Sequence, residues 1–289
     1  MNEILSKVKN LNLNILKISD NFFNGNYRSI FKGNGIDFSE YKKYEYGDDT
    51  KYIDWKVSLR KGVFYKRKFI EERNINVILV VDISSSMFFF NKKDILFNFS
   101  LIISYLTLKN NDNLSLITFC DNVIDYFKPQ KTKNNFLNII NYLSNMHFKE
   151  NRKTNIKACL EFINKTIRKK SVIFFISDFI SNIDYEKEIK ICSHKHDFIS
   201  VVIDIKEENI LNNTGIIKVY NPENNKYILI DTSLNNDFYL YSKENKENLL
   251  NLFNKNSIDS LFLNNDDFLL ELNNFFKFRR SKVNVQTSL

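Results

Sequence analysis

Short apolar runs alternate with longer segments of helical periodicity from about residue 74 onward, and this alternation limits the folds that the chain can adopt. The runs are rich in β-branched residues and lack the regular polar positions of a strand with one face in water, so each is typical of a strand buried on both faces. Four runs have this character: residues 76–84, 114–120, 171–179 and 197–205. Strands that alternate with helices predict an α/β fold with a doubly wound, mostly parallel sheet.

The segments between these runs complete the order of elements. Helices are predicted over residues 94–109, 134–146, 155–169 and 184–195, and an edge strand over residues 122–127. After the fourth run we expect a hairpin, a helix, a short strand and a final helix, at residues 214–233, 237–254, 257–263 and 266–280. We therefore assign one α/β domain to residues 74–280 and expect the polar tail, residues 281–289, to be frayed.

The first 73 residues differ in character from this α/β body. Apolar residues near the start recur at helical spacing and predict an amphipathic helix, with a stripe formed by Ile4, Val8, Leu11, Ile15 and Ile18. The stretch that follows is rich in loops and aromatic residues. We expect residues 1–73 to form an extension packed on the body. A helix on a membrane surface is the alternative, but the stripe lacks the aromatic and Arg-rich character of such helices.

Charge and cysteine content restrict the environment and the partners of the chain. Lys and Arg number 42 against 34 Asp and Glu, which gives a net charge of +8. Residues 149–170 hold eight basic residues against two acidic ones, so the excess of positive charge is local.

Cys120, Cys159 and Cys192 show no CxxC spacing, which favours a reducing compartment. Because no apolar run approaches the roughly 20 residues of a membrane span and the start does not resemble a signal peptide, the protein is predicted to be cytoplasmic.

Polar side chains follow the predicted strands at the edge of the sheet where ligands bind in doubly wound folds. Asp82, Ser84 and Ser86 follow the first buried strand, Asp178 follows the third, and Thr154 precedes the helix that leads into the third. Two carboxylates and three hydroxyls form an all-oxygen donor set of the kind that hard divalent cations prefer, so this set predicts a Mg²⁺ (or Mn²⁺) site. Capping of the following helices is the alternative role for these residues.

The order and spacing of Asp82-x-Ser84-x-Ser86, Thr154 and Asp178 resemble the metal-ion-dependent adhesion site (MIDAS) of von Willebrand factor A domains. The resemblance covers about residues 74–275 and implies a von Willebrand factor A-like, Rossmann-like fold. It further implies that the two serines and the threonine bind the ion directly or through water, while the aspartates act largely through water or hold the loops. An exposed Asp or Glu of a partner protein would then complete the coordination.

A second resemblance extends over nearly the whole chain, to the bacterial domain of unknown function 58 family. The motifs that carry it are Arg28-Ser29, Gly33-x-Gly35, Asp37-Phe38-x-Glu40, Tyr44-x-x-Gly47-Asp48-Asp49, Ile53-Asp54-Trp55, Val202-Ile203-Asp204 and Phe275-Phe276-x-x-Arg279. The resemblance implies cooperation with a MoxR-type AAA+ ATPase and other von Willebrand A proteins, in a chaperone-like role in the maturation or assembly of other proteins. The sequence departs from A domains before Thr154, where a glycine-containing loop is usual and Glu150-Asn151-Arg152-Lys153 stands here.

Basic residues flank Thr154. Arg152, Lys153 and Lys157 are predicted to form a positive rim that steers an acidic partner toward the metal. A solvated helix face in a Lys-rich chain is the alternative interpretation.

Two other functional classes remain open at this point. A metal-dependent hydrolase would need a general base, and the only candidates are the two aspartates at the predicted site, so we predict that the protein is not an enzyme. The chain also lacks the GxxxxGK[ST] motif of P-loop nucleotide sites. A nucleic-acid-binding protein is less favoured, because no base-reading or base-stacking motif accompanies the positive charge.

Overall fold

The computed structural model describes residues 41–47, 50, 53–67, 75–147, 151–181, 183–205, 216–221, 226–231, 235–264 and 268–286. The chain divides into a large unit that includes Ile75–Leu289 and a small unit, Lys32–Asn74. In the described part of the chain no helix is long and apolar enough to cross a membrane.

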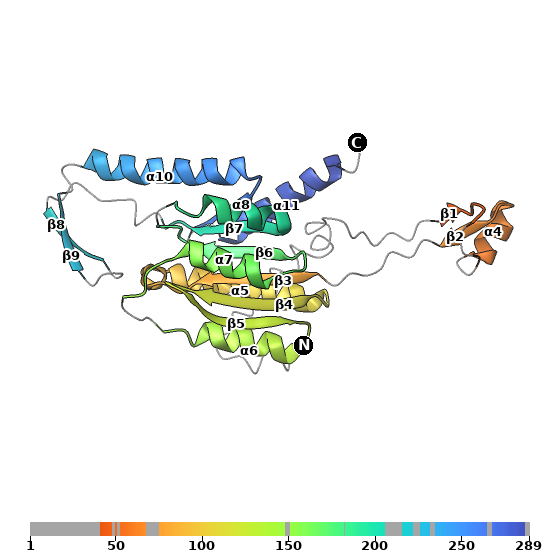
Figure 1. Ribbon diagram of the computed structural model, residues 1–289, viewed down its shortest axis with the longest axis horizontal. Coiled ribbons are helices and arrows are strands. Elements are labelled where there is room, and N and C mark those ends of the chain that lie inside the picture. Colours follow the sequence, from red (N-terminus) through yellow and green to blue (C-terminus); the bar gives the residue numbers. More distant parts are fainter. Residues whose placement is uncertain are drawn as a thin grey trace. The chain divides into compact units, whose positions relative to one another are not determined.

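A six-stranded sheet forms the centre of the large unit (Figure 1). Its strands, in the order in which they lie side by side, are β10 (Asp259–Leu263), β7 (Asp197–Ile203), β6 (Val172–Ser177), β3 (Asn76–Asp82), β4 (Asn113–Phe119) and β5 (Val123–Gln130). All neighbours pair in parallel except β4 and β5, which are antiparallel. The strand order grows outward from β3 in both directions, as in a doubly wound sheet, which confirms the predicted fold class.

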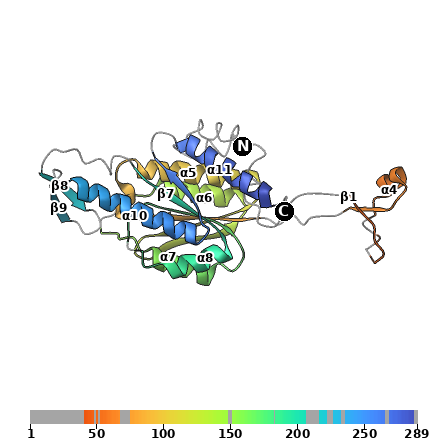
Figure 2. The same cartoon turned by 90° about the horizontal axis from the view of Figure 1, so that it is seen from above.

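Helices cover both faces of this sheet (Figure 2). One face packs against α5 (Lys92–Lys109), α6 (Lys133–Ser144) and α11 (Phe268–Gln286), and the other against α7 (Ile156–Thr166), α8 (Glu186–Lys195) and α10 (Asn235–Lys255). Strand β3 supplies both cores, because Val77 and Leu79 point into the first and Ile78 and Val80 into the second. Burial on both faces explains why the strands read as continuous apolar runs.

The observed elements differ from the sequence prediction mainly at their ends. Helix α5 begins at Lys92, earlier than predicted, because this lysine is buried although its sequence context is polar. Helix α11 continues to Gln286, beyond the predicted end at residue 280, and the fraying of the tail stays a prediction. The predicted hairpin forms a separate two-stranded sheet of β8 (Ile216–Asn221) and β9 (Lys226–Asp231). The three cysteines are buried and free, as expected for a chain without disulfides.

The small unit contains β1 (Tyr41–Lys43), α4 (Trp55–Lys61) and β2 (Tyr65–Arg67). Asp54 caps α4 by accepting a hydrogen bond from the backbone N–H of Val57. Trp55 packs edge-to-face on Phe64 but stays 61% exposed. The packing of the extension, residues 1–73, on the body stays a prediction. The predicted amphipathic helix and the motifs up to Glu40, together with Asp48 and Asp49, lie outside the described residues.

Arg279 fastens α11 to the sheet. Its Nη2 lies 2.7 and 2.8 Å from the two carboxylate oxygens of Asp197, and its Nε lies 3.4 Å from Asp259. Because the guanidinium is largely buried, Arg279→Met should lower the free energy of unfolding by about 3 kcal/mol. Urea denaturation measures this loss. Lys277→Met, on an exposed position of the same helix, should change stability by less than about 0.5 kcal/mol; an equal loss in both variants would contradict a specific role for Arg279.

Candidate functional site

Backbone hydrogen bonds join three loops at the C-terminal edge of the parallel strands. The N–H of Ser85 donates to the carbonyl of Arg152 at 2.9 Å, and the N–H of Arg152 donates to the Ser85 hydroxyl at 3.0 Å. The N–H of Asn155 donates to the carbonyl of Cys120 at 2.8 Å. The segment that carries Thr154 is therefore fixed on both sides, to the loop after β3 and to the end of β4.

Asp82 is fully buried at the end of β3. Its Oδ1 accepts a hydrogen bond from the N–H of Ser84 at 2.8 Å, and its Oδ2 accepts one from the hydroxyl of Ser177 at 2.6 Å. Burial, and secondarily the negative charge of Asp178, raise the pKa of Asp82 from 3.8 to about 7, although both hydrogen bonds act in the opposite direction. The two neutral donors therefore do not balance the negative charge of this buried carboxylate. A cation at the site would stabilise that charge.

The hydroxyl oxygens of Ser84 and Ser86 lie 3.2 Å apart, within hydrogen-bond distance of each other. Two neighbouring ligands of an octahedral Mg²⁺ ion with bonds of about 2.1 Å would be separated by about 3.0 Å, so this pair suits such an ion. Ser84 precedes the 3-10 helix η2 (Ser85–Phe88) but its side chain forms no capping hydrogen bond. Helix α7 is capped by Asn155, whose side chain accepts from the N–H of Ala158, and not by Thr154. Capping therefore does not account for Ser84, and Thr154 is not the N-cap residue of α7.

Asp178 lies at the end of β6 and is held by two donors. Its Oδ2 is 2.9 Å from the Nζ of Lys92, and its Oδ1 accepts a hydrogen bond from the N–H of Ile180 at 3.2 Å. The side chains of Lys92 and Asp178 are 0% and 1% exposed, so the ion pair is fully buried. Sequence reasoning did not include Lys92 in the site, because a lysine in the segment Asn91-Lys92-Lys93 is typical of a solvated helix start.

The five predicted ligand residues differ in how closely they contact one another. Hydrogen bonds link Asp82 directly with Ser84, and Ser84 with Ser86. Asp178 adjoins Asp82 closely enough to raise the pKa of that carboxyl. Thr154 is half-exposed in the adjoining loop. Among the described residues no three His, Cys, Asp or Glu side chains gather into a cluster, so a cation at this edge would depend on hydroxyl oxygens as well as carboxylates.

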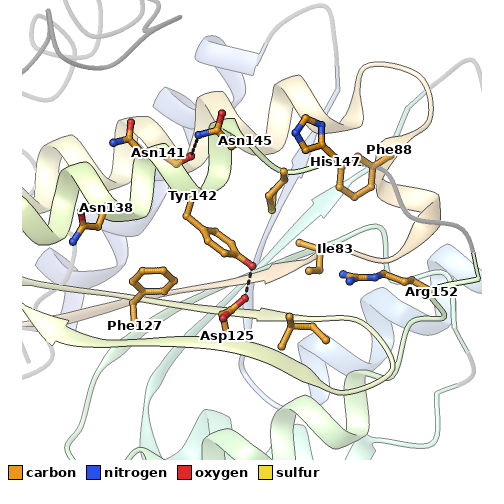
Figure 3. A pocket seen from close by; sticks show the side chains of 12 residues that line it. Ile83, Phe88, Asp125, Phe127, Asn138, Asn141, Tyr142, Asn145, His147 and Arg152 are labelled. Carbon is orange, nitrogen blue, oxygen red and sulfur yellow. Dashed lines mark hydrogen bonds between the residues drawn. The ribbon is translucent and has the colours of Figure 1, made fainter.

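The residues of the predicted rim lie beside this edge. Lys153 is exposed, whereas Arg152 and Lys157 are half-exposed. Arg152 also lines a cavity of about 610 Å³ between β5 and α6 (Figure 3). Within this cavity the hydroxyl of Tyr142 donates to Asp125 at 2.6 Å, and the pKa of Tyr142 is raised, first by burial and then by this bond. Lys153 is therefore the exposed member of the predicted rim, and Arg152 lies at the cavity.

Comparison with known families agrees with this architecture. Residues 40–248, more than half of the chain, match the family described as "Protein of unknown function DUF58". The chain belongs to the DUF58 family. Uncharacterized proteins of Mycobacterium bovis and Mycobacterium tuberculosis are 19% identical to this DUF58 protein over 243 residues, which are 82% of this chain and 77% of each relative. Neither the description of the family nor the names of these relatives refers to a catalysed reaction.

Solved structures that match part of this chain include proteins of two Bacteroides species. A conserved hypothetical protein, BatB from Bacteroides thetaiotaomicron, matches with a TM-score of 0.46 and 14% identity, over 73% of this chain and 98% of that one. An aerotolerance-related membrane protein from Bacteroides fragilis, studied with multiple mutations to serine, matches with a TM-score of 0.43 and 15% identity, over 73% and 99% of the two chains. At these scores and identities the similarity carries no information on function.

Proposed function

We propose that this DUF58 protein is a metal-dependent protein–protein interaction adaptor. The observation that carries the proposal is the state of Asp82, a buried carboxylate with only neutral donors on its oxygens, beside two hydroxyls spaced as octahedral ligands. Such a carboxylate costs free energy unless a cation balances its charge. A Mg²⁺ or Mn²⁺ ion is the simplest cation that this donor set would hold.

The roles of the residues follow from their chemistry. Ser84, Ser86 and Thr154 would hold the ion as neutral ligands, and Asp82 and Asp178 would support it through water. When bound, the ion would supply an electrophilic centre for one further oxygen ligand. Because hydroxyl ligands leave much of its charge uncompensated, a carboxylate is the ligand that such a centre favours.

The partner would then be a protein with an exposed Asp or Glu. Lys153, with Arg152 and Lys157, places positive charge beside the site and would accelerate the approach of an acidic surface. The resemblance of the motifs to the family suggests a MoxR-type AAA+ ATPase as the cooperating protein, acting with this adaptor in protein maturation or complex assembly. The function would be recruitment and not catalysis, since the site offers no general base other than the two aspartates.

Replacement of Asp82 tests the proposal directly. Asp82→Ala should abolish Mg²⁺ binding in isothermal titration calorimetry, because it removes a fully buried carboxylate whose hydrogen-bond donors are neutral. The same variant should fail to recover the wild-type set of partners from native cells lysed with Mg²⁺. Asp94→Ala, on an exposed position of α5, is the control and should behave as the wild type.

Salt dependence separates the role of the rim from that of the ion. Lys153→Glu should retain Mg²⁺ binding but should recover less of each partner, with a weaker dependence on salt.

Partner recovery by Asp82→Ala at the wild-type level would remove the metal from the mechanism.

A further inference from the structure

A buried ammonium group lies within the candidate site. Lys92 is the first residue of α5 and is completely buried, and its Nζ is 2.9 Å from the Oδ2 of Asp178. A lysine is rarely buried without a specific partner, because removal of its charge from water costs several kcal/mol. Asp178 is such a partner, and it directly follows Ser177, whose hydroxyl donates to the Oδ2 of Asp82 at 2.6 Å.

The charge of the site differs with and without this lysine. Two ionised aspartates and one ammonium leave a net charge of −1. A divalent cation changes this to +1, and only a further carboxylate makes the site neutral. Without Lys92 the two aspartates alone would neutralise the cation, and an added carboxylate would leave an excess negative charge. In a buried environment such differences are large, because charges interact strongly at low effective dielectric.

We infer that Lys92 is a positioning residue that weakens cation binding to the empty site and couples it to the arrival of the partner's carboxylate. The inference rests on the proposed function and adds a regulatory property to the same site. The coupling is reciprocal, so a bound carboxylate strengthens cation binding by the same factor as the cation strengthens carboxylate binding. The adaptor would then hold its ion firmly only in the complex.

The direction of the effect separates this role from a purely structural one. A lysine that only keeps Asp178 in place would, when replaced, disturb the site and weaken cation binding. A lysine that opposes the cation would, when replaced, strengthen cation binding even though the protein itself becomes less stable. Affinity for the ion and stability should therefore change in opposite directions.

The test measures Mg²⁺ affinity by calorimetry at a pH near 8, together with the rise of the melting temperature on addition of Mg²⁺. Lys92→Met should bind Mg²⁺ about tenfold or more tightly than the wild type. Lys92→Gln, which can still donate a hydrogen bond to Asp178, should show the same direction and serves if the Met variant does not fold. Lys93→Met is the matched control, since Lys93 is half-exposed and donates to the carbonyl of Met146, and its affinity should be unchanged.

Two further measurements isolate the charge. The double variant Lys92→Met/Asp178→Asn has the net charge of the wild-type site and should bind Mg²⁺ more weakly than Lys92→Met alone, because it also lacks one of the two carboxylates that support the ion. Replacement of chloride by acetate at constant ionic strength should raise the Mg²⁺ affinity of the wild type about fivefold, and should have a smaller effect on Lys92→Met.

The outcomes distinguish this inference from the proposed function. If the wild type binds Mg²⁺ and both Lys92 variants bind it equally or more weakly, the inference is wrong and the metal site stands. If no variant binds Mg²⁺, the proposed function is wrong, and the inference with it. If only the Lys92 variants bind Mg²⁺ and acetate does not restore binding to the wild type, the ammonium excludes the cation from the natural site, which overturns both.

Discussion

Asp82→Asn should remove a large part of the pH dependence of stability between about pH 4 and pH 7. In the folded wild type, burial and the neighbouring Asp178 raise the pKa of Asp82 to about 7, against 3.8 for an unperturbed aspartate. The folded state therefore retains a proton that the unfolded chain has released, and the free energy of unfolding falls as the pH rises through this range. The fall contributed by Asp82 should be about 4 kcal/mol.

Urea denaturation from about pH 4 to pH 8 in the presence of EDTA measures this effect as the difference between the wild type and the variant. The contribution of protonated Asp82 to the free energy of unfolding of the wild type should be fully present below the pKa of an unfolded aspartate, about pH 4. This contribution should disappear as the pH approaches 7. The asparagine does not titrate, so the difference between the two proteins should follow mainly the titration of Asp82, with a smaller contribution from its interaction with Asp178. Parallel stability curves over the whole range would contradict the raised pKa.

Addition of Mg²⁺ extends this prediction to the proposed ion. A cation that binds next to Asp82 stabilises the ionised carboxylate, so it should restore the stability of the wild type above about pH 6 and leave Asp82→Asn nearly unaffected. Equal stabilisation of both proteins would place the binding of the cation elsewhere.

Much of the fold was predictable from the sequence, for a definite physical reason. Strands buried on both faces read as continuous β-branched runs, and the amphipathic helices between them leave few alternatives to a doubly wound sheet. Once the strands are parallel, their carboxyl ends share one edge, and the direct pairing of β3 with β6 then brings Asp82 and Asp178 near each other. The ends of α5 and α11 were less predictable, because local polarity does not reveal which polar residues a helix buries.

The burial of Lys92 could not be predicted from the sequence. The lysines at 92 and 93 are adjacent and chemically identical, yet one is fully buried and the other half-exposed. The angle at which α5 leaves the loop after η2 decides which of the two meets Asp178, and that angle is a property of tertiary packing. The sequence therefore located the carboxylates of the site but not the cation that already balances one of them. Similarly, the sequence motif Ile53-Asp54-Trp55 gave no indication that Asp54 caps α4.

Asp178→Asn should destabilise the protein by about 3 kcal/mol or more, because it removes the carboxylate that forms a fully buried ion pair with the ammonium of Lys92. The measurement is urea denaturation at about pH 5 without divalent cations, where the folded protein keeps Asp82 protonated and the repulsion between the two carboxylates is absent. Asp184→Asn, an exposed position on the same loop, is the control and should change stability by less than about 0.5 kcal/mol.

The double variant Lys92→Met/Asp178→Asn should recover most of this loss, since a buried pair replaced by neutral groups of similar size costs much less than one unpaired charge. The coupling energy between the two positions, obtained from the double-mutant cycle, should therefore be of the order of 2–3 kcal/mol. Additive losses in the double variant would mean that the two side chains contribute independently. In that case the ammonium would not be the countercharge of Asp178, and Asp178 would remain, like Asp82, a carboxylate that depends on an added cation.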